Sequence, residues 1–326
     1  MKKTTSVLFF SRKCREEVWE YDFILNELLT SNVNVETHFL SFEEVKNINQ
    51  TFDVFVYSCR DPKEYEWGYM PSYEDALECV LKIKPKIIIQ LSDEYRHENL
   101  EQHNDLAKYC NLMLRQYNHS EYRNLYFGTS IPDYKNLIHM PLGYLNDTKV
   151  SRSEIIPINK RKYDWSFVGK IKDDQFYYYD FDSSKWLPTT DRTKMIELFS
   201  LSIPNYFFAE SGIDKKQLVD LYNNSIFVPC GRGNTSLNCF RNYESTICGA
   251  IPVVVSKFPD EFDIAFKFFE KPPWIFSNCW EDAIEKCNNL LKCPDQIQQM
   301  QSDNLKWWDN FLENIQRRIM YELFKK

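Results

Sequence analysis

The stretch Asn224–Pro259 combines the side chains and the spacing needed to hold an anionic ligand. An apolar run, Ser225–Val228, is followed by the loop 229–235, which has a glycine on each side of Arg232. Glycine lets backbone N–H groups approach an anion closely, and a helix N-terminus adds about half a positive charge. The stretch therefore predicts a phosphate site made by the Gly231–Gly233 backbone and by arginine.

A helix is expected to follow this loop, over about Leu237–Cys248, with Ser236 as its N-cap and Gly249 at C′. Arg241 lies on this helix and can bind phosphate oxygens in a bidentate manner. Glu244 lies on the same face as Arg241, roughly 12 Å along the axis from Ser236, where a carboxylate could accept hydrogen bonds from a ribose diol. The alternative is a surface ion pair between Arg241 and Glu244, with the glycines making an ordinary turn.

The elements around this stretch predict an α/β protein. A β-branched run, Ile251–Val255, completes a strand–loop–helix–strand unit, which implies a parallel sheet. Further strands are expected at 7–10, 33–40, 52–58, 86–91, 112–115, 138–142, 165–168, 206–208 and 274–276, and further helices at 16–29, 72–83, 98–109, 191–201, 214–222, 279–291 and 294–324.

These elements form two series on either side of a polar segment, 146–161, which is typical of an interdomain linker. We expect two Rossmann-like domains, residues 1–150 and 151–305, that face a cleft lined by the carboxyl ends of both sheets. The amphipathic end of the last helix, residues 306–326, is expected to cross back to the first domain.

Composition narrows the class of protein. The 326 residues carry a net charge of −7 with scattered Lys and Arg, so no nucleic-acid partner is expected. The apolar run at Val7–Phe10 is too short for a signal sequence, and no stretch approaches the ~20 apolar residues that span a bilayer. We therefore expect a cytoplasmic protein, in the host cytoplasm if the source is viral, whose oligomeric state stays open.

The stretch 224–259 resembles the exostosin-like glycosyltransferases, glycosyltransferase family 47, and the chain is nearest in size to compact viral or bacterial members. The matching positions are Phe227, Pro229, Gly231, Ser236, Arg241, Tyr243, Glu244, Gly249, Ile251, Pro252 and Val253. A weaker resemblance covers Trp165–Lys170 together with Arg192, and in the first half the segments QLSDE and MPLGY, residues 90–94 and 140–144.

The resemblance implies a GT-B fold, with the acceptor mostly on the first domain and the nucleotide sugar on the second. It implies a metal-independent, inverting transfer from a nucleotide-diphosphate sugar, UDP-linked by default, to a glycan hydroxyl, with no resident cofactor. By the resemblance, Glu244 binds the ribose, and Arg232, Arg241 and the Gly231–Gly233 backbone bind the diphosphate. The same nucleotide site would include Gly169, Lys170, Asn234 and Ser236.

The sequence leaves open which sugar is transferred and which class of activity the protein has. Xylose, glucuronic acid, galactose and N-acetylglucosamine are all open as the transferred sugar. The other hypotheses are a nucleotide-sugar-modifying enzyme such as an epimerase, and a non-catalytic carbohydrate-binding protein with the same fold.

An inverting transfer needs a general base for the acceptor hydroxyl. The base is expected in a loop of the first domain, and Asp93, directly after the strand 86–91, is our first choice. Glu94 and His97 in the same loop are alternatives, as are Asp61 and Glu64 after the preceding strand.

A metal site is not expected. Asp180-Phe181-Asp182 spells the DxD signature of metal-dependent glycosyltransferases of another fold, but three residues are a weak match. The ten cysteines have no CxxC pair and no regular spacing, which favours free thiols over a zinc site.

Overall fold

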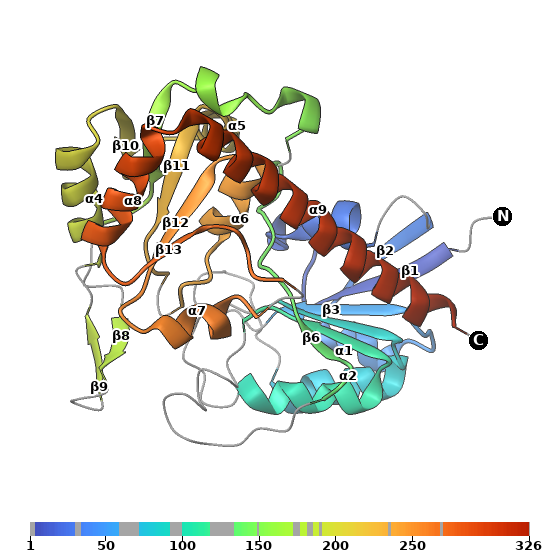
Figure 1. Ribbon diagram of the computed structural model, residues 1–326. Helices are drawn as coiled ribbons and strands as arrows, with labels where there is room; N and C mark the ends of the chain where they lie inside the picture. Colours follow the sequence, from blue (N-terminus) through green and yellow to red (C-terminus); the bar gives the residue numbers. More distant parts are fainter. Residues whose placement is uncertain are drawn as a thin grey trace. The chain divides into compact units, whose positions relative to one another are not determined.

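The computed structural model describes residues 4–29, 34–58, 72–91, 100–117, 134–148, 150–171, 177–180, 185–188, 191–233, 236–267 and 270–325. The chain divides into two compact units, one made of residues 1–142 and 312–326 and one of residues 143–311 (Figure 1). Each unit contains a parallel β-sheet with helices packed on it, so the predicted α/β class is confirmed.

The first unit is built on a six-stranded parallel sheet of order β2-β1-β3-β4-β5-β6. Its strands are β1 (Thr4–Phe10), β2 (Asn34–Leu40), β3 (Val54–Ser58), β4 (Ile87–Leu91), β5 (Leu112–Arg115) and β6 (Leu137–His139). Strands β3, β4 and β5 are buried at every position, as expected for the near-continuous apolar runs of a parallel sheet covered on both faces.

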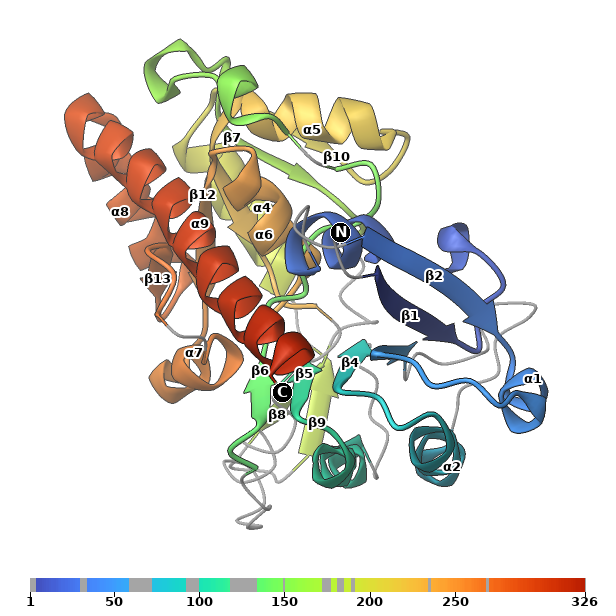
Figure 2. The same cartoon turned by 90° about the vertical axis from the view of Figure 1, so that its right-hand side faces the viewer.

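One face of this sheet is covered by α1 (Phe42–Asn47), α2 (Tyr73–Ile83) and the 3₁₀ helix η4 (Leu100–Tyr109), whose apolar side chains share one core with β1, β3, β4 and β5 (Figure 2). The predicted N-cap at Ser72 is confirmed, because its hydroxyl accepts the N–H of Asp75 in a capping box.

The continuous helix predicted for residues 16–29 is wrong. The chain instead forms a short 3₁₀ helix, η1 (Arg15–Glu17), and a π-helix, η2 (Phe23–Leu28). Arg15 and Asp22 make an ion pair of 2.7 Å between these two helices. In a straight helix residues seven apart lie roughly 10 Å apart along the axis, so this pair requires the break.

The second unit is built on a five-stranded parallel sheet of order β10-β7-β11-β12-β13. Its strands are β7 (Tyr163–Val168), β10 (Tyr206–Ala209), β11 (Ser225–Cys230), β12 (Ile251–Val255) and β13 (Ile275–Ser277). An antiparallel hairpin that the sequence did not predict, β8 (Tyr177–Asp180) and β9 (Lys185–Pro188), precedes β10 in the chain.

The described part of the second unit contains the 3₁₀ turns η5 (Arg152–Glu154) and η6 (Ile158–Lys160). They are followed by the helices α4 (Asp191–Ser202), α5 (Lys215–Asn223), α6 (Phe240–Ile247), α7 (Pro259–Ala265), α8 (Trp280–Leu291) and α9 (Pro294–Phe324). Helix α4 contacts α8, and α5 contacts α6. Right-handed crossovers explain this pairing. The crossover β7–α4–β10 runs across the sheet in the opposite direction to β11–α6–β12, so α4 and α6 lie on opposite faces. Helix α9 belongs to the second unit up to Phe311 and to the first from Leu312.

A buried arginine joins four backbone segments of the second unit. The Arg161 guanidinium donates to the carbonyl oxygens of Ile156 (3.1 Å), Tyr222 (3.0 Å), Ser225 (2.6 Å) and Cys248 (2.8 Å). Burial lowers the pKa of Arg161 to about 10. The side chain satisfies carbonyls that would otherwise be buried without a donor.

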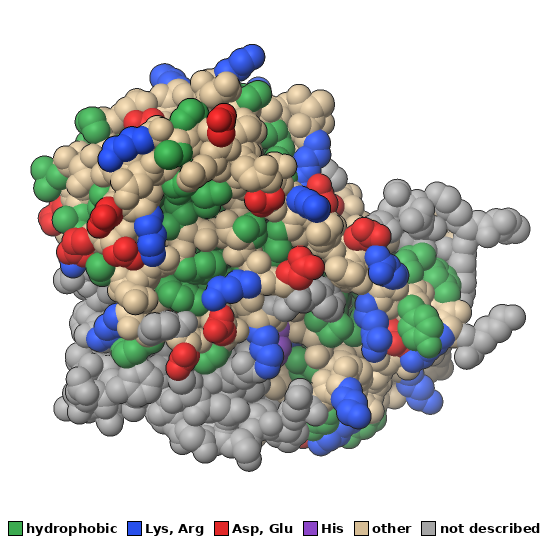
Figure 3. Space-filling model, in the orientation of Figure 1, with side chains coloured by type: hydrophobic (Ala, Val, Ile, Leu, Met, Phe, Trp, Pro, Cys, Tyr) green, Lys and Arg blue, Asp and Glu red, His purple; other side chains and the backbone are tan. Residues whose placement is uncertain are grey.

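The described part of the chain contains no helix that is both long and apolar enough to cross a bilayer. On the face drawn in Figure 3, Lys and Arg side chains are interspersed with Asp and Glu. The described residues on this face therefore form no extended patch of one charge.

Candidate functional site

The order of the second sheet defines where a ligand is expected. From β7 the chain first moves to β10 on one side and later to β11 on the other. In open parallel sheets, ligands bind beyond the carboxyl ends of the strands at such a switch point. Gly169 and Lys170 follow β7, and Gly231–Gly233 follow β11, so the structure brings these predicted residues to the same edge. Asn234 lies outside the described residues.

Arg241 reaches this edge from helix α6. Its Nη2 donates to the carbonyl oxygen of Val168 at 2.8 Å, and its guanidinium lies 4.3 Å from the ring centroid of Phe167. The close approach depends on Gly169, since a Cβ there would come within 2.7 Å of Arg241 Nη2 and Gly169 has a φ of +148°. The sequence suggested Gly169 only through the family resemblance.

Arg241 is partly exposed and has no carboxylate partner among the described residues, and its buried Nε makes no hydrogen bond there. Among the residues that the structure describes, only the Val168 carbonyl oxygen accepts from this guanidinium, so further N–H donors are available at the switch point. Such a group favours an anionic ligand, because a carboxylate or phosphate can accept two parallel hydrogen bonds from it.

Glu244 lies one turn beyond Arg241 and is 4% exposed. Its Oε1 accepts the N–H of Leu145 at 3.4 Å. Burial raises the pKa of Glu244 to about 7, although the Leu145 N–H and the charge of Arg241 act in the opposite direction. The alternative of a surface ion pair between Arg241 and Glu244 is wrong, because Glu244 is buried and Arg241 donates to Val168 instead.

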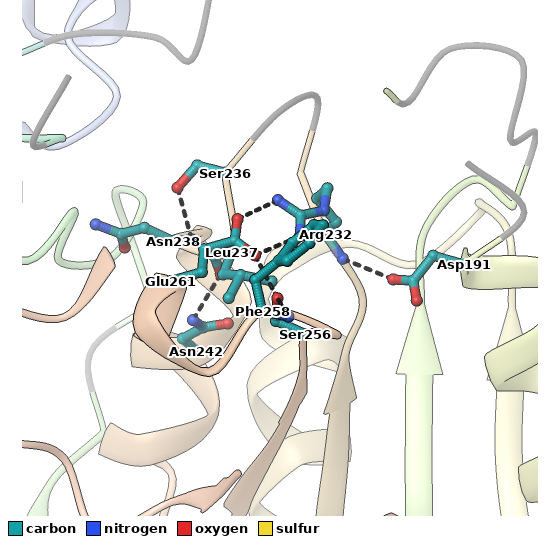
Figure 4. Close-up of polar contacts among 9 residues, drawn as sticks. All are labelled: Asp191, Arg232, Ser236, Leu237, Asn238, Asn242, Ser256, Phe258 and Glu261. Atoms are coloured by element: carbon teal, nitrogen blue, oxygen red, sulfur yellow. Dashed lines mark hydrogen bonds and ion pairs between the residues drawn. The ribbon is translucent and has the colours of Figure 1, made fainter. Parts of the chain in front are cut away.

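Arg232 is held by its backbone and by its side chain (Figure 4). Its N–H donates to Asp191 Oδ2 at 3.2 Å, and its carbonyl accepts Nε and Nη2 of Arg192 at 3.0 and 2.8 Å. Its guanidinium forms a bidentate ion pair with Glu261, in which the Nη2–Oε2 distance is 2.7 Å. This pairing argues against the predicted direct contact between Arg232 and a diphosphate.

Arg192 also connects the two loops of the switch point. Its Nη1 donates to the carbonyl oxygen of Lys170 at 3.0 Å, while its other nitrogens hold Arg232. The loop after β7 and the loop after β11 are therefore fixed to one side chain at the start of α4. The Lys170 side chain is exposed beside them.

The predicted N-cap at Ser236 is wrong. Helix α6 begins at Phe240, and the Ser236 hydroxyl accepts the N–H of Asn238 at 2.9 Å in the turn before it. Asn242 Nδ2 stabilises this turn by donating to the carbonyl oxygen of Leu237 at 3.1 Å. A side chain that binds the backbone in this way competes with the first helical turn. Gly249, with a φ of +71°, is confirmed at C′.

Two thiols that the sequence analysis did not assign to the site flank the glycine loop. Cys230 is buried at the end of β11, and Cys239, just before α6, donates to Asn242 Oδ1 at 2.9 Å. The Cys230 thiol and the charge of Arg241 lower the pKa of Cys239 despite its burial. Cys230 directly precedes Gly231 and Cys239 stands six residues after Gly233, so both positions were readable in the sequence.

The predicted base lies outside the described residues. Asp93 and its alternatives Glu94, His97, Asp61 and Glu64 all fall there, and so does Asp182 of the DxD match. Asp180 is the last residue of β8. In the ranges that the structure describes, no group of three or more His, Cys, Asp or Glu residues could hold a metal ion.

No protein-family model matches the chain, and no curated protein matches it in sequence. Solved structures that are similar in fold include the following three. HepE from Anabaena in complex with UDP has a TM-score of 0.53 at 10% identity, covering 98% of this chain and 99% of that one. The same protein with UDP and glucose has a TM-score of 0.52 at 11% identity, with coverages of 98% and 99%. BGT of T4 phage in complex with UDP-glucose has a TM-score of 0.50 at 12% identity, with coverages of 99% and 100%.

At these identities the likeness establishes the fold. The chain has the α/β fold of the GT-B glycosyltransferases, with two parallel sheets, as the sequence predicted.

Proposed function

We propose that this protein transfers a sugar from a UDP-linked donor to a hydroxyl group of a glycan acceptor. The observation that carries the proposal is Arg241, an arginine with no carboxylate partner among the described residues, held at the switch point of the second sheet. The fold supports it, as do the UDP bound to HepE and the UDP-glucose bound to BGT. The pattern shared with the exostosin-like family, which includes Arg241 and Glu244, points the same way.

In this proposal Arg241 and the Gly231–Gly233 backbone bind the diphosphate, near the loop that contains Gly169 and Lys170. Glu244 accepts hydrogen bonds from the ribose hydroxyls. The Arg232 guanidinium is engaged by Glu261 and contributes through the position of its loop.

We propose an inverting single displacement. The acceptor oxygen attacks the anomeric carbon, the bond from that carbon to the UDP oxygen breaks, and the acceptor proton passes to a general base, for which Asp93 stays the prediction. The leaving diphosphate gains negative charge, so the Arg241 guanidinium stabilises the transition state more than the ground state. An arginine in this role makes a resident metal ion or cofactor unnecessary.

The proposal is tested by binding and by turnover. UDP should raise the melting temperature of the protein, because ligand binding to the folded state stabilises it by mass action. Arg241→Met should weaken UDP binding by about 10- to 100-fold, in keeping with the loss of a charge-assisted hydrogen bond. Arg152→Gln, which removes an exposed arginine of the same unit that pairs with Asp309, is the matched control and should bind UDP normally.

Release of UDP from UDP-sugars on addition of glycan acceptors then separates an enzyme from a binding protein. Activity should persist after removal of metal ions with EDTA. Equal UDP affinity of the wild-type protein and Arg241→Met would contradict the proposed site, and binding without any UDP release would favour a non-catalytic protein.

A further inference from the structure

The loop after β11 is held from two sides. From the α4 side, Asp191 and Arg192 bind the N–H and the carbonyl of Arg232. Asp191 is itself fixed, because Trp280 Nε1 donates to its Oδ1 at 2.6 Å. The fit is close, since a Cβ at Gly231 would come within 2.9 Å of Arg192 Cγ.

From the other side the loop is held by Glu261, which has no exposed surface and lies on α7. Its two carboxylate oxygens accept the two terminal nitrogens of Arg232, and one of them also accepts the hydroxyl of Ser256. Ser256 follows β12, and its hydroxyl oxygen accepts the N–H of Phe258 at 3.1 Å. Glu261 thus connects the loop after β11 to the loop after β12 (Figure 4).

A buried ion pair is a poor source of stability, because desolvation of the two charges offsets most of their attraction. Its bidentate geometry, however, fixes the position and orientation of the arginine. Here the arginine is the central residue of the glycine loop, so fixing it also fixes the peptide groups of Gly231 and Gly233 on either side.

From this geometry we infer that Glu261 is a positioning residue, which holds the 231–233 backbone through Arg232 in the arrangement that receives the donor diphosphate. The inference rests on the proposed function and adds to it a residue that makes no contact with the donor. A loop that is already ordered loses less conformational entropy on binding, which increases affinity.

The test measures the order of the 231–233 loop and the affinity for UDP separately. Glu261→Gln removes the carboxylate charge that faces the buried Arg232 guanidinium. A second variant, Arg232→Met with Glu261→Leu, removes both charges of the pair and retains side-chain volume. Asp263→Asn is the matched control, since Asp263 lies on the same helix in an exposed ion pair with Lys271. For each variant, hydrogen–deuterium exchange of the peptide containing 231–233 and the Kd for UDP are measured.

In both Glu261 variants the backbone amides of 231–233 should exchange faster, and UDP should bind about tenfold more weakly. Asp263→Asn should match the wild-type protein in both measurements. Unchanged exchange at 231–233 in the folded double variant overturns the inference, and so does an unchanged Kd for UDP. If the wild-type protein binds no UDP, the proposed function fails and the positioning role fails with it. The exchange data distinguish that outcome from a failure of Glu261 to hold the loop.

Discussion

Replacing Glu244 with glutamine should stabilise the protein above neutral pH while weakening donor binding. Burial raises the pKa of Glu244 from its ordinary value of 4.5 to about 7. Above pH 4.5 this carboxyl group loses its proton in the unfolded chain but keeps it in the folded chain until about pH 7. In that window the folded state binds more protons, so the contribution of Glu244 to stability falls as the pH rises.

The size of this effect on stability follows from the same two pKa values. One pKa unit corresponds to about 1.4 kcal/mol, so ionisation of Glu244 in the folded protein costs about 3 kcal/mol. Glutamine has the same shape, can accept the Leu145 N–H and does not titrate. The free energy of unfolding of Glu244→Gln minus that of the wild-type protein should therefore be smallest near pH 4.5. It should grow by about 1.4 kcal/mol per pH unit and level off above pH 7.

Urea unfolding followed by tryptophan fluorescence at several pH values measures this difference. Six of the eight tryptophans lie in the second unit, at positions 165, 186, 274, 280, 307 and 308. Glu285→Gln, which changes an exposed carboxylate of α8 in the same unit, should follow the wild-type pH curve. A stability difference that is the same at pH 5 and pH 8 would refute the argument from burial. Glu244→Gln should also bind UDP more weakly, which would make it a more stable but less functional variant.

Three further predictions concern other residues of the second unit. Arg161→Met should lower the free energy of unfolding by about 3 kcal/mol in urea denaturation, because it leaves buried carbonyl groups without a donor; an unchanged midpoint would show that water replaces the guanidinium. Gly169→Ala should displace Arg241 and raise the Kd for UDP by about tenfold or more in calorimetry; wild-type affinity would exclude a role of Arg241 in UDP binding. Cys239, whose pKa is lowered, should react with iodoacetamide at pH 7 faster than Cys287, whose pKa is raised by burial, as measured by mass spectrometry of the two peptides; equal rates would contradict the electrostatic effect of the neighbouring groups.

The residue at which a helix begins can be predicted from the local sequence. Ser72 and Ser236 both precede apolar helical patterns, but the structure makes an N-cap of Ser72 alone. Three residues after Ser72 stands Asp75, whose carboxylate accepts the backbone N–H of Ser72, whereas three residues after Ser236 stands Cys239. The missing carboxylate was readable in the sequence, so this error was avoidable.

The partner of a charged side chain, in contrast, cannot be predicted from the local sequence. Arg232 was expected to bind phosphate because it stands between two glycines, but its partner is Glu261, 29 residues later on another helix. Nothing in the glycine loop specifies that partner, since the pairing depends on where α7 places Glu261 in the folded chain. Glu244 is similar, because its spacing from Arg241 predicts a shared helix face but not whether that face is exposed or buried.

The sequence by itself determined the α/β class, the parallel strands and the stretch in which the candidate site lies, because apolar runs, glycines and capping residues act on neighbours within about one helical turn or one strand. The tertiary structure decided which charges are available to a ligand. It left Arg241 with donors that no described residue accepts at the switch point, paired Arg232 with Glu261 and buried Glu244. These outcomes depend on contacts between residues far apart in the chain, and on the loss of water around them, which no local pattern encodes.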